Sequence, residues 1–347
     1  MIKLYLLDTI SNSRGQLFPL LKPFLKKETF TDEERKQLYG VSQTDFTIVD
    51  DLLECDFAVV PNTWNYYVEG GSVTNISKRI KQCEKPVWSF CSGDFGVAIP
   101  NLINCYVFRC NGNQSKLSNF HKGAPVFIND PLLKHFGQKD VVLRDYHQKP
   151  IIGFCGQANS SAINSFKELS RTIFRNCSFA LGLRKQLPQP VFSTSKLRAT
   201  ILKTFVRNKA ITTNFIFRRK YRAGVKTPLE KEKTTQEFYD NMLQSDYVVC
   251  VRGGGNFSVR FYEALSMGRI PIFINTDCLL PLSTKIDWKK HVVWVEYQER
   301  HLVVEKVIAF HEKLNSESFR NLQKANRKLW KESLTLGGFF KKTANEI

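Results

Sequence analysis

The sequence predicts an α/β protein built from two Rossmann-like domains. Its 347 residues, 42% of them hydrophobic, suffice for two separate cores. Short apolar runs alternate with helix-like segments in both halves, a pattern typical of βαβ units and a parallel sheet. A polar stretch that ends in proline, Arg144–Pro150, lies between the halves and marks the domain boundary.

The first predicted domain covers residues 1–148. Its strands are expected at the apolar runs Ile2–Leu7, Phe57–Val60, Pro86–Phe90, Cys105–Phe108 and Val126–Ile128. A helix is predicted to begin after Thr31, because this N-cap residue is followed by carboxylates in the first turn. Asp50 and Asp51 are interpreted as the start of a short helix rather than as part of a metal-binding motif.

The second predicted domain covers residues 149–325, and a helical tail, 326–347, is expected to pack back towards the first domain. Its strands are expected at Ile151–Gly156, Tyr247–Val251, Pro271–Ile274 and Val292–Val295. Its helices are expected at Phe166–Phe174, Gln236–Gln244, Phe257–Met267, Leu302–Asn315 and Phe319–Trp330. The basic stretch Arg184–Lys226 is predicted to be a loop or a helical insertion.

The strongest chemical signal is a buried strand, a turn of three glycines and a helix that opens near Asn256 to Ser258. Glycines let backbone N–H groups approach an anion closely, and a helix N-terminus adds about half a positive charge. Arg252 and Arg260 flank the turn with guanidinium groups that can hold phosphate bidentately. Ligands of open α/β sheets bind beyond the carboxyl ends of the strands, where this turn lies.

A carboxylate near the turn, Glu263, can accept hydrogen bonds from ribose hydroxyls while phosphates sit on the glycines. The alternative is a plain tight turn, with Arg260 and Glu263 forming an i,i+3 surface pair. The turn matches neither the Walker pattern nor G-x-G-x-x-G, which disfavours ATP hydrolysis and dinucleotide chemistry.

Several ordered elements of the chain resemble the exostosin family of glycosyltransferases. They are Arg252-Gly253, Ser258-Val-Arg260, Glu263-Ala264, Gly268, Ile270-Pro271, Leu280-Pro281 and Ile286-Asp287-Trp288. Upstream, Cys55–Pro61 and the turn Ser92-Gly-Asp94-Phe-Gly96 are similar to a strand and a turn of the family. The resemblance spans about residues 47–295 and is dense in the C-terminal part. It implies a GT-B fold, in which two Rossmann-like domains face a central cleft.

The resemblance also implies an inverting transfer, in which an acceptor hydroxyl displaces a nucleoside diphosphate from the anomeric carbon of a sugar. This reaction needs a general base and positive charge for the leaving group. The residues expected to hold the donor are Arg252, Gly253, Gly254, Gly255, Asn256, Ser258, Arg260 and Glu263, the last at the ribose. Metal independence is expected, because the chain shows neither a convincing Asp-x-Asp turn nor metal-ligand spacing among its histidines.

Asp94 is the leading candidate for the base, although it equally fits an ordinary turn aspartate. Asp8, at the end of the first strand, is the second candidate, and His147 is the histidine to test. Two departures from the family leave the base and the acceptor open: Gly93 replaces a histidine, and Glu84–Phe90 replaces a Gly-Arg-Asp-His element.

The net charge of +19 is unevenly placed, since residues 169–229 contain fourteen Lys or Arg and no Asp or Glu. Such a block is commonly a solvated face. Alternatively, the region 171–226 docks on anionic lipid or on a lipid-diphosphate acceptor. A nucleic-acid-binding protein is a rival, because aromatic residues interleave with the charges, namely Phe192, Phe205, Phe215, Phe217 and Tyr221. The sequence shows no RRM, KH or helix-turn-helix signature.

A UDP-sugar is the favoured donor, with a glycan or glycolipid as acceptor. A fucosyltransferase-like enzyme that uses a GDP-sugar and an inactive member that only binds sugar nucleotide are the alternatives. The chain shows no signal peptide and no apolar stretch long enough to span a bilayer. With nine scattered cysteines, this favours a reducing, cytoplasmic or peripheral-membrane location.

Overall fold

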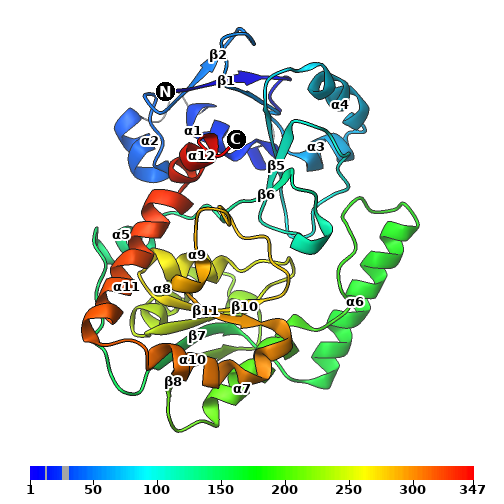
Figure 1. The fold of residues 1–347 in the computed structure, drawn as a ribbon. Coiled ribbons are helices and arrows are strands. Elements are labelled where there is room, and N and C mark those ends of the chain that lie inside the picture. The colour runs from blue at the N-terminus through cyan, green and yellow to red at the C-terminus, as the bar shows by residue number, and fades with distance from the viewer. Residues whose placement is uncertain (12–13, 26–30) are drawn as a thin grey trace.

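The structure is a computed structural model that describes residues 1–11, 14–25 and 31–347. It contains two separate parallel β-sheets, one in each half of the chain, with helices packed around them (Figure 1). The predicted α/β class with two Rossmann-like domains is therefore confirmed.

The N-terminal sheet has six parallel strands in the order β2-β1-β3-β4-β5-β6. Its strands are β1 (Ile2–Leu6), β2 (Phe46–Val49), β3 (Phe57–Val59), β4 (Val87–Cys91), β5 (Cys105–Arg109) and β6 (His121–Gly123). The helices of this half are α1 (Lys22–Leu25), α2 (Asp32–Tyr39), α3 (Trp64–Glu69), α4 (Val73–Gln82) and α5 (Pro131–Phe136). Helix α2 begins as predicted, because the Thr31 side chain accepts a hydrogen bond from the amide of Glu34.

The C-terminal sheet has five parallel strands in the order β11-β10-β9-β7-β8. They are β7 (Ile151–Gln157), β8 (Thr212–Arg218), β9 (Tyr247–Cys250), β10 (Ile270–Asn275) and β11 (Val293–Glu296). The helices are α6 (Ala162–Ala180), α7 (Thr194–Val206), α8 (Pro228–Leu243), α9 (Val259–Ser266), α10 (Val303–His311), α11 (Ser316–Leu329) and α12 (Leu336–Ala344). No helix in the described ranges has both the length and the apolar character needed to cross a bilayer.

The C-terminal helices connect the two domains. Helix α11 runs along the C-terminal domain, and α12 then lies beneath the N-terminal sheet (Figure 1). Phe339 and Phe340 of α12 are buried there, and their rings lie 5.8 and 5.3 Å from that of Phe108 on β5. Burying a side chain of this size contributes about 1.5–3 kcal/mol, so the tail helps to hold the domains together.

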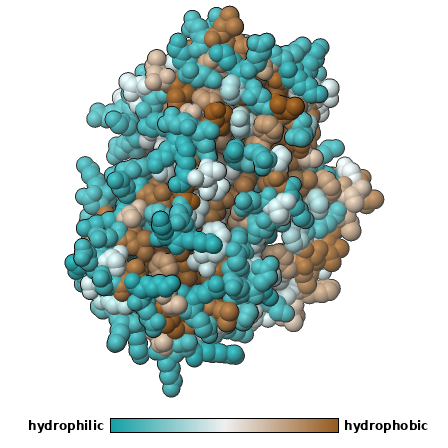
Figure 2. Space-filling model, viewed as in Figure 1, coloured by the Kyte–Doolittle hydropathy of each residue, from teal (hydrophilic) through white to brown (hydrophobic). Residues whose placement is uncertain are grey.

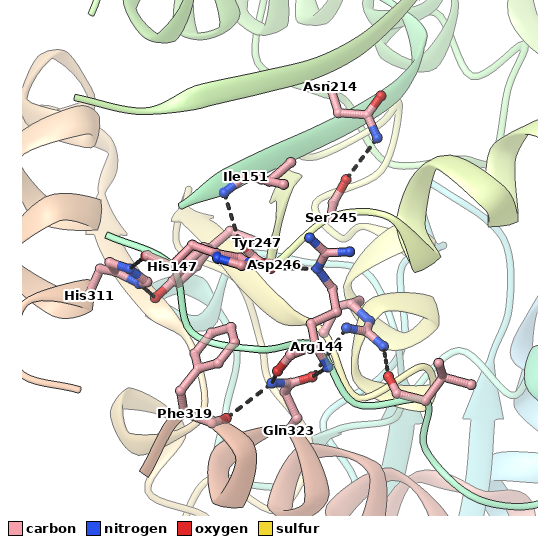
Figure 3. A network of polar contacts seen from close by, with 12 residues as sticks. Arg144, His147, Ile151, Asn214, Ser245, Asp246, Tyr247, His311, Phe319 and Gln323 are labelled. Atoms are coloured by element: carbon pink, nitrogen blue, oxygen red, sulfur yellow. Dashed lines mark hydrogen bonds and ion pairs between the residues drawn. The ribbon is translucent and has the colours of Figure 1, made fainter. Parts of the chain in front are cut away.

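The linker between the domains is anchored on the C-terminal side (Figure 3). The buried carboxylate of Asp246 accepts hydrogen bonds from Arg144 Nε at 2.5 Å and from the amide of Ile151 at 2.8 Å. The side-chain amide of Gln323, on α11, bonds both the amide and the carbonyl of Arg144. The polar break seen in the sequence is thus an ordered connection with fixed partners.

Some elements differ from the sequence-based expectations. The strand expected at Val126–Ile128 is wrong, because β6 lies at His121–Gly123, where it pairs with β5, and residues 126–128 belong to no helix or strand. The helix expected at Asp50 and Asp51 is also wrong, because a turn forms in which the Asp51 carboxylate accepts from the amide of Leu53. The basic stretch contains a full helix, α7, and the edge strand β8.

Candidate functional site

The glycine turn follows strand β9 and leads into helix α9, with Ser258 at the N-cap. Within the turn, the amide of Gly253 donates to the carbonyl of Phe257 at 3.1 Å. That amide is therefore engaged in the turn itself and cannot also donate to an anion. In the described chain, the amides of Gly254 and Gly255 have no such acceptor, so they are the amides of this turn that can meet a ligand.

Arg252, directly after β9, is a buried cation with only 4% of its surface exposed. Its Nη2 donates to the carbonyl of Gly254 at 3.2 Å, and its guanidinium carbon lies 5.3 Å from the ring centre of Phe192. Burial lowers the pKa of Arg252. The side chain thus closes the turn and presents its charge beside the glycines.

Arg260, in the first turn of α9, points back across the sheet towards β7. Its Nη2 donates to the carbonyl of Cys155 at 2.8 Å, and its guanidinium stacks 4.4 Å from the ring centre of Phe154. Burial lowers the pKa of Arg260. Gly156 makes room for it, since a Cβ there would lie 2.7 Å from Arg260 Nη2.

Arg198 on α7 is a third arginine of the cluster, and sequence reasoning missed it. It donates to the carbonyls of Gln157 at 2.9 Å and of Arg252 at 3.3 Å. Burial, reinforced by the charge of Arg260, lowers the pKa of Arg198 to about 10. Arg198 lies in the stretch 169–229, which has no Asp or Glu, and this was its one distinguishing feature in the sequence. Nothing separated it from the other lysines and arginines of that stretch.

The three arginines form a site of uncompensated positive charge. In the described part of the chain, none of them has a carboxylate within ion-pair distance. Each also buries an Nε atom without an acceptor there. Buried charges are normally paired, so this cluster suits an anionic ligand that brings the missing acceptors.

Asp94 meets the glycine turn from the other domain. It follows β4, and a Cβ placed on Gly254 would lie 3.3 Å from its Oδ2. At Gly255 a Cβ would lie 2.4 Å from the Asp94 carbonyl oxygen, so only glycine permits this approach. The carboxylate therefore lies at the domain interface, directly against the predicted donor turn.

Neighbouring amides fix the loop that carries Asp94. The side-chain oxygen of Asn65 accepts from the amide of Ser92 at 2.9 Å and from its hydroxyl at 3.0 Å. On the other side, the amide group of Asn111 donates to the carbonyl of Gly93, and the buried Arg109 holds Asn111 in place. The loop is thus positioned by side chains of its own domain.

Two adjoining pockets, of about 480 and 450 Å³, run from this contact along helix α6. They share Arg175, Arg184 and Gln189, so we treat them as one feature, the α6 groove. Asp94 lines one of the two pockets, and Arg252 with Gly254 lines the other. The groove therefore connects the carboxylate of one domain with the cationic turn of the other.

A third pocket, of about 420 Å³, lies at the carboxyl ends of β10 and β11, and we call it the β-edge pocket. Its lining includes Phe192, Arg252, Asn275, Glu296 and Tyr297. The Glu296 carboxylate accepts from the amide of Asn275 at 2.9 Å and from the indole of Trp294 at 2.7 Å. Sequence reasoning missed Glu296, although it directly follows a predicted strand.

Two of the residues predicted to bind the sugar donor, Glu263 and Asn256, have side chains that bond other parts of the protein. Glu263 accepts a hydrogen bond from the hydroxyl of Tyr239 at 3.2 Å and faces α8. Asn256 is 1% exposed, and its side-chain amide binds the carbonyls of Gly112, Thr276 and Asp277. Asn256 thus joins the two domains below the turn, and its predicted donor contact, like that of Glu263, stays a prediction.

The other candidate bases lie away from these pockets. Asp8 accepts from Tyr67 at 3.2 Å and pairs with Arg79 at 3.4 Å. His147 lies on the anchored linker, with an exposed side chain and a carbonyl bonded to His311 (Figure 3). Neither is brought to the glycine turn.

A candidate anion site at the carboxyl edge of one Rossmann-like sheet, faced by a carboxylate from the other domain, is the arrangement expected of a GT-B glycosyltransferase. Residues 186–307 match the Exostosin GT47 domain. Over these residues the match confirms the resemblance to the exostosin family that the sequence predicted.

Two curated relatives match a short part of the chain. Exostosin-1 of Drosophila melanogaster is 39% identical over 59 residues, which is 17% of this chain and 8% of that protein. The probable glucuronosyltransferase GUT1 of Oryza sativa subsp. japonica is 35% identical over 60 residues, 17% of this chain and 14% of that protein. The chain thus covers only a small fraction of their length.

One solved structure aligns with the chain at low similarity. The catalytic domain of starch synthase IV from Arabidopsis thaliana, bound to ADP and acarbose, aligns with a TM-score of 0.26 at 13% identity. The alignment covers 58% of this chain and 39% of that one.

Proposed function

We propose that the protein transfers a sugar from a nucleoside-diphosphate sugar to a hydroxyl of a glycan or glycolipid, with inversion at the anomeric carbon. The observation that carries this proposal is the buried cluster of Arg198, Arg252 and Arg260 at the glycine turn, next to Asp94 of the opposite domain. The cluster suits the leaving diphosphate, and the carboxylate suits the attacking hydroxyl.

The arginines act on the leaving group. As the bond from the anomeric carbon to the diphosphate breaks, the electron pair moves onto the diphosphate oxygen. Fixed cations in a site shielded from water stabilise that charge strongly. Three guanidinium groups supply this charge from the chain itself, which supports transfer without a metal ion.

Asp94 acts on the acceptor. Its carboxylate takes the proton from the acceptor hydroxyl as the hydroxyl oxygen attacks the anomeric carbon. The close approach of Asp94 to Gly254 supports this role, because it puts the base beside the turn that would hold the donor. A single base on the face opposite the leaving group gives inversion.

The β-edge pocket suits the nucleoside. Arg252 belongs both to this pocket and to the arginine cluster. A nucleoside diphosphate whose phosphates bind the cluster can therefore place its nucleoside in this pocket. Tyr297 offers an aromatic ring and Glu296 a carboxylate for ribose hydroxyls, a role that we also keep for Glu263. A UDP-sugar remains the favoured donor, with a GDP-sugar as the alternative.

The α6 groove suits the acceptor, because Asn65, Gln186 and Gln189 can exchange hydrogen bonds with sugar hydroxyls. Nucleic-acid binding loses support, since Phe205 and Phe215 pack in the C-terminal core and are not free to stack on bases. The expected cytoplasmic or peripheral-membrane location stays a prediction.

A thermal-shift panel of UDP- and GDP-sugars, followed by an assay for released nucleoside diphosphate, tests the proposal. A ligand at 100 times its Kd stabilises the folded protein by about 2.7 kcal/mol, which raises Tm by several degrees. Lack of any shift or turnover, together with salt-sensitive binding to nucleic acid, would contradict the proposal.

A further inference from the structure

Helix α6 turns polar side chains inward and apolar side chains outward. The side chains that it buries are Ser165, Thr172 and Ser178, each donating to a main-chain carbonyl four residues earlier. Its exposed apolar side chains are Ile163 (70%), Phe166 (70%), Ile173 (49%) and Phe174 (67%), continued by Leu181 (73%) after the helix. This is the reverse of the usual arrangement in a surface helix.

The apolar residues form one continuous face. Their spacings of three, seven and eight residues place them on one side of the helix. In the described part of the chain, α6 contributes no residue to the hydrophobic cores. The helix stands at the side of the molecule (Figure 1), and apolar side chains gather at that position in the space-filling view (Figure 2). Exposed apolar patches of this kind mark interaction surfaces.

The charges around this face have one sign. Lys167 and Arg171 lie on exposed positions of α6, and Arg184 and Lys185 follow it. The single acidic residue of α6, Glu168, turns inward, where its carboxylate accepts from the hydroxyl of Ser193 at 2.7 Å. A second copy of the chain docked through this face would bring like charges together, whereas an anionic surface would neutralise them.

We propose that the exposed face of α6 docks onto an anionic lipid surface. The apolar side chains enter the boundary between headgroups and acyl chains, and the lysines and arginines bind the phosphates above it. This is the behaviour of helices that lie in a membrane interface with apolar residues on one face and basic residues beside them. Each basic residue near such a surface adds attraction that salt weakens.

Docking also orients the active site. The α6 groove is lined by Thr172 and Arg175 from the opposite side of α6 and also by Arg171 and Phe174, so the apolar face borders the groove. Resting on the proposed function, we infer that the groove then opens beside the headgroups, where the sugar of a lipid-linked acceptor would lie. One helix would serve both as membrane contact and as a wall of the acceptor site.

Co-sedimentation with lipid vesicles tests the proposal without reference to turnover. The full chain is incubated with phosphatidylcholine vesicles that contain or lack about 30 mol% phosphatidylserine, at low and at physiological salt. We expect binding to the anionic vesicles that weakens with salt. The variant Ile163→Ser/Phe166→Ser should lower the partition coefficient by at least about tenfold, because it removes two inserting side chains.

A matched control removes two apolar side chains of the N-terminal domain that are more exposed still, Leu53 and Ile103, as Leu53→Ser/Ile103→Ser. It should bind like the unchanged chain. Equal binding of Ile163→Ser/Phe166→Ser, or no binding of the unchanged chain at low salt, would overturn the proposal. A dimer in solution that dissociates only in that variant would instead assign the face to a second copy. A donor-dependent thermal shift that persists in the variant separates failure of docking from failure of the proposed function.

Discussion

The two turns that meet in the cleft are built in opposite ways. The C-terminal turn gathers buried arginines without carboxylate partners in the described chain, and its glycines leave the backbone accessible. The N-terminal turn presents one carboxylate, Asp94, and its own buried cation, Arg109, donates hydrogen bonds from Nε and Nη2 to Asn111 behind the loop. The C-terminal turn is suited to bind an anion, whereas the N-terminal turn carries a negative charge of its own.

The difference indicates how the reaction is divided between the domains. Unpaired buried charge is costly to the folded protein and persists where a ligand uses it. Hydrogen bonds within a loop, such as those from Arg109 to Asn111, fix its geometry. We therefore expect changes on the C-terminal turn to affect binding and leaving-group departure, and changes at Asp94 to affect proton transfer alone.

The largest effect is expected from Asp94→Asn, which keeps the shape of the side chain and removes the proton acceptor. Turnover should fall by about a hundredfold or more, while donor binding in the thermal-shift assay stays intact. Asp8→Asn is the matched control, because Asp8 also ends a strand but bonds Tyr67 and Arg79 away from the cleft. Normal turnover of Asp94→Asn would leave Asp94 as a turn residue and move the search to Asp8 and His147.

A comparable loss is expected from Arg252→Ala and from Arg260→Ala, because each removes a cation from the leaving diphosphate. A lost contact to developing charge costs about 3 kcal/mol, or roughly a hundredfold in turnover. Unlike Asp94→Asn, both variants should also weaken the donor-induced thermal shift. Arg207→Ala, at an exposed cation near the end of α7, serves as the control. Unchanged turnover in both folded variants would remove the arginine cluster from the mechanism.

The sequence predicted the C-terminal turn better than its surroundings, for a physical reason. One short stretch of the chain contains the strand, the glycines, Arg252 and Arg260. Local pattern and strand polarity therefore suffice to predict that these residues lie close together. Arg198 reaches the same place from α7, 54 positions before Arg252, and only tertiary packing shows it. Strand β8 was hidden in the basic stretch, because it is an edge strand whose side chains are mostly half-exposed.

The N-terminal side was predicted less well, since its contacts are almost all long-range. The resemblance pointed to Asp94, but the glycine that lets it approach lies in the other domain, at Gly254. Long-range contacts also decide the role of Asn256. The sequence predicted that it binds the sugar donor, because it directly follows the three glycines. Its bonds to Gly112 and Asp277 come from segments that local pattern cannot connect.

Asn256→Ala is expected to affect stability more than chemistry. The side chain is buried and joins the backbone of both domains, so its removal leaves buried carbonyls without a donor. Each such group costs about 1–3 kcal/mol, and we expect a loss of about 2 kcal/mol or more in urea unfolding. The exposed Asn119→Ala should change the unfolding free energy little. A fully stable Asn256→Ala with lost donor binding would instead assign Asn256 to the donor.

The smallest expected effect, and the sharpest test within the C-terminal half, concerns the ribose. Glu263→Gln should weaken binding of UDP severalfold and leave binding of pyrophosphate unchanged, because pyrophosphate has no ribose to contact. The structure supplies a rival, Glu296, whose carboxylate lines the β-edge pocket, whereas Glu263 is bonded to Tyr239. Calorimetry of UDP and pyrophosphate with Glu263→Gln and Glu296→Gln compares the two carboxylates directly. A selective loss of UDP binding at Glu296 alone would assign the ribose to the β-edge pocket. Equal losses of both ligands in Glu263→Gln would mean that Glu263 acts by holding α8 and α9 together behind Arg260.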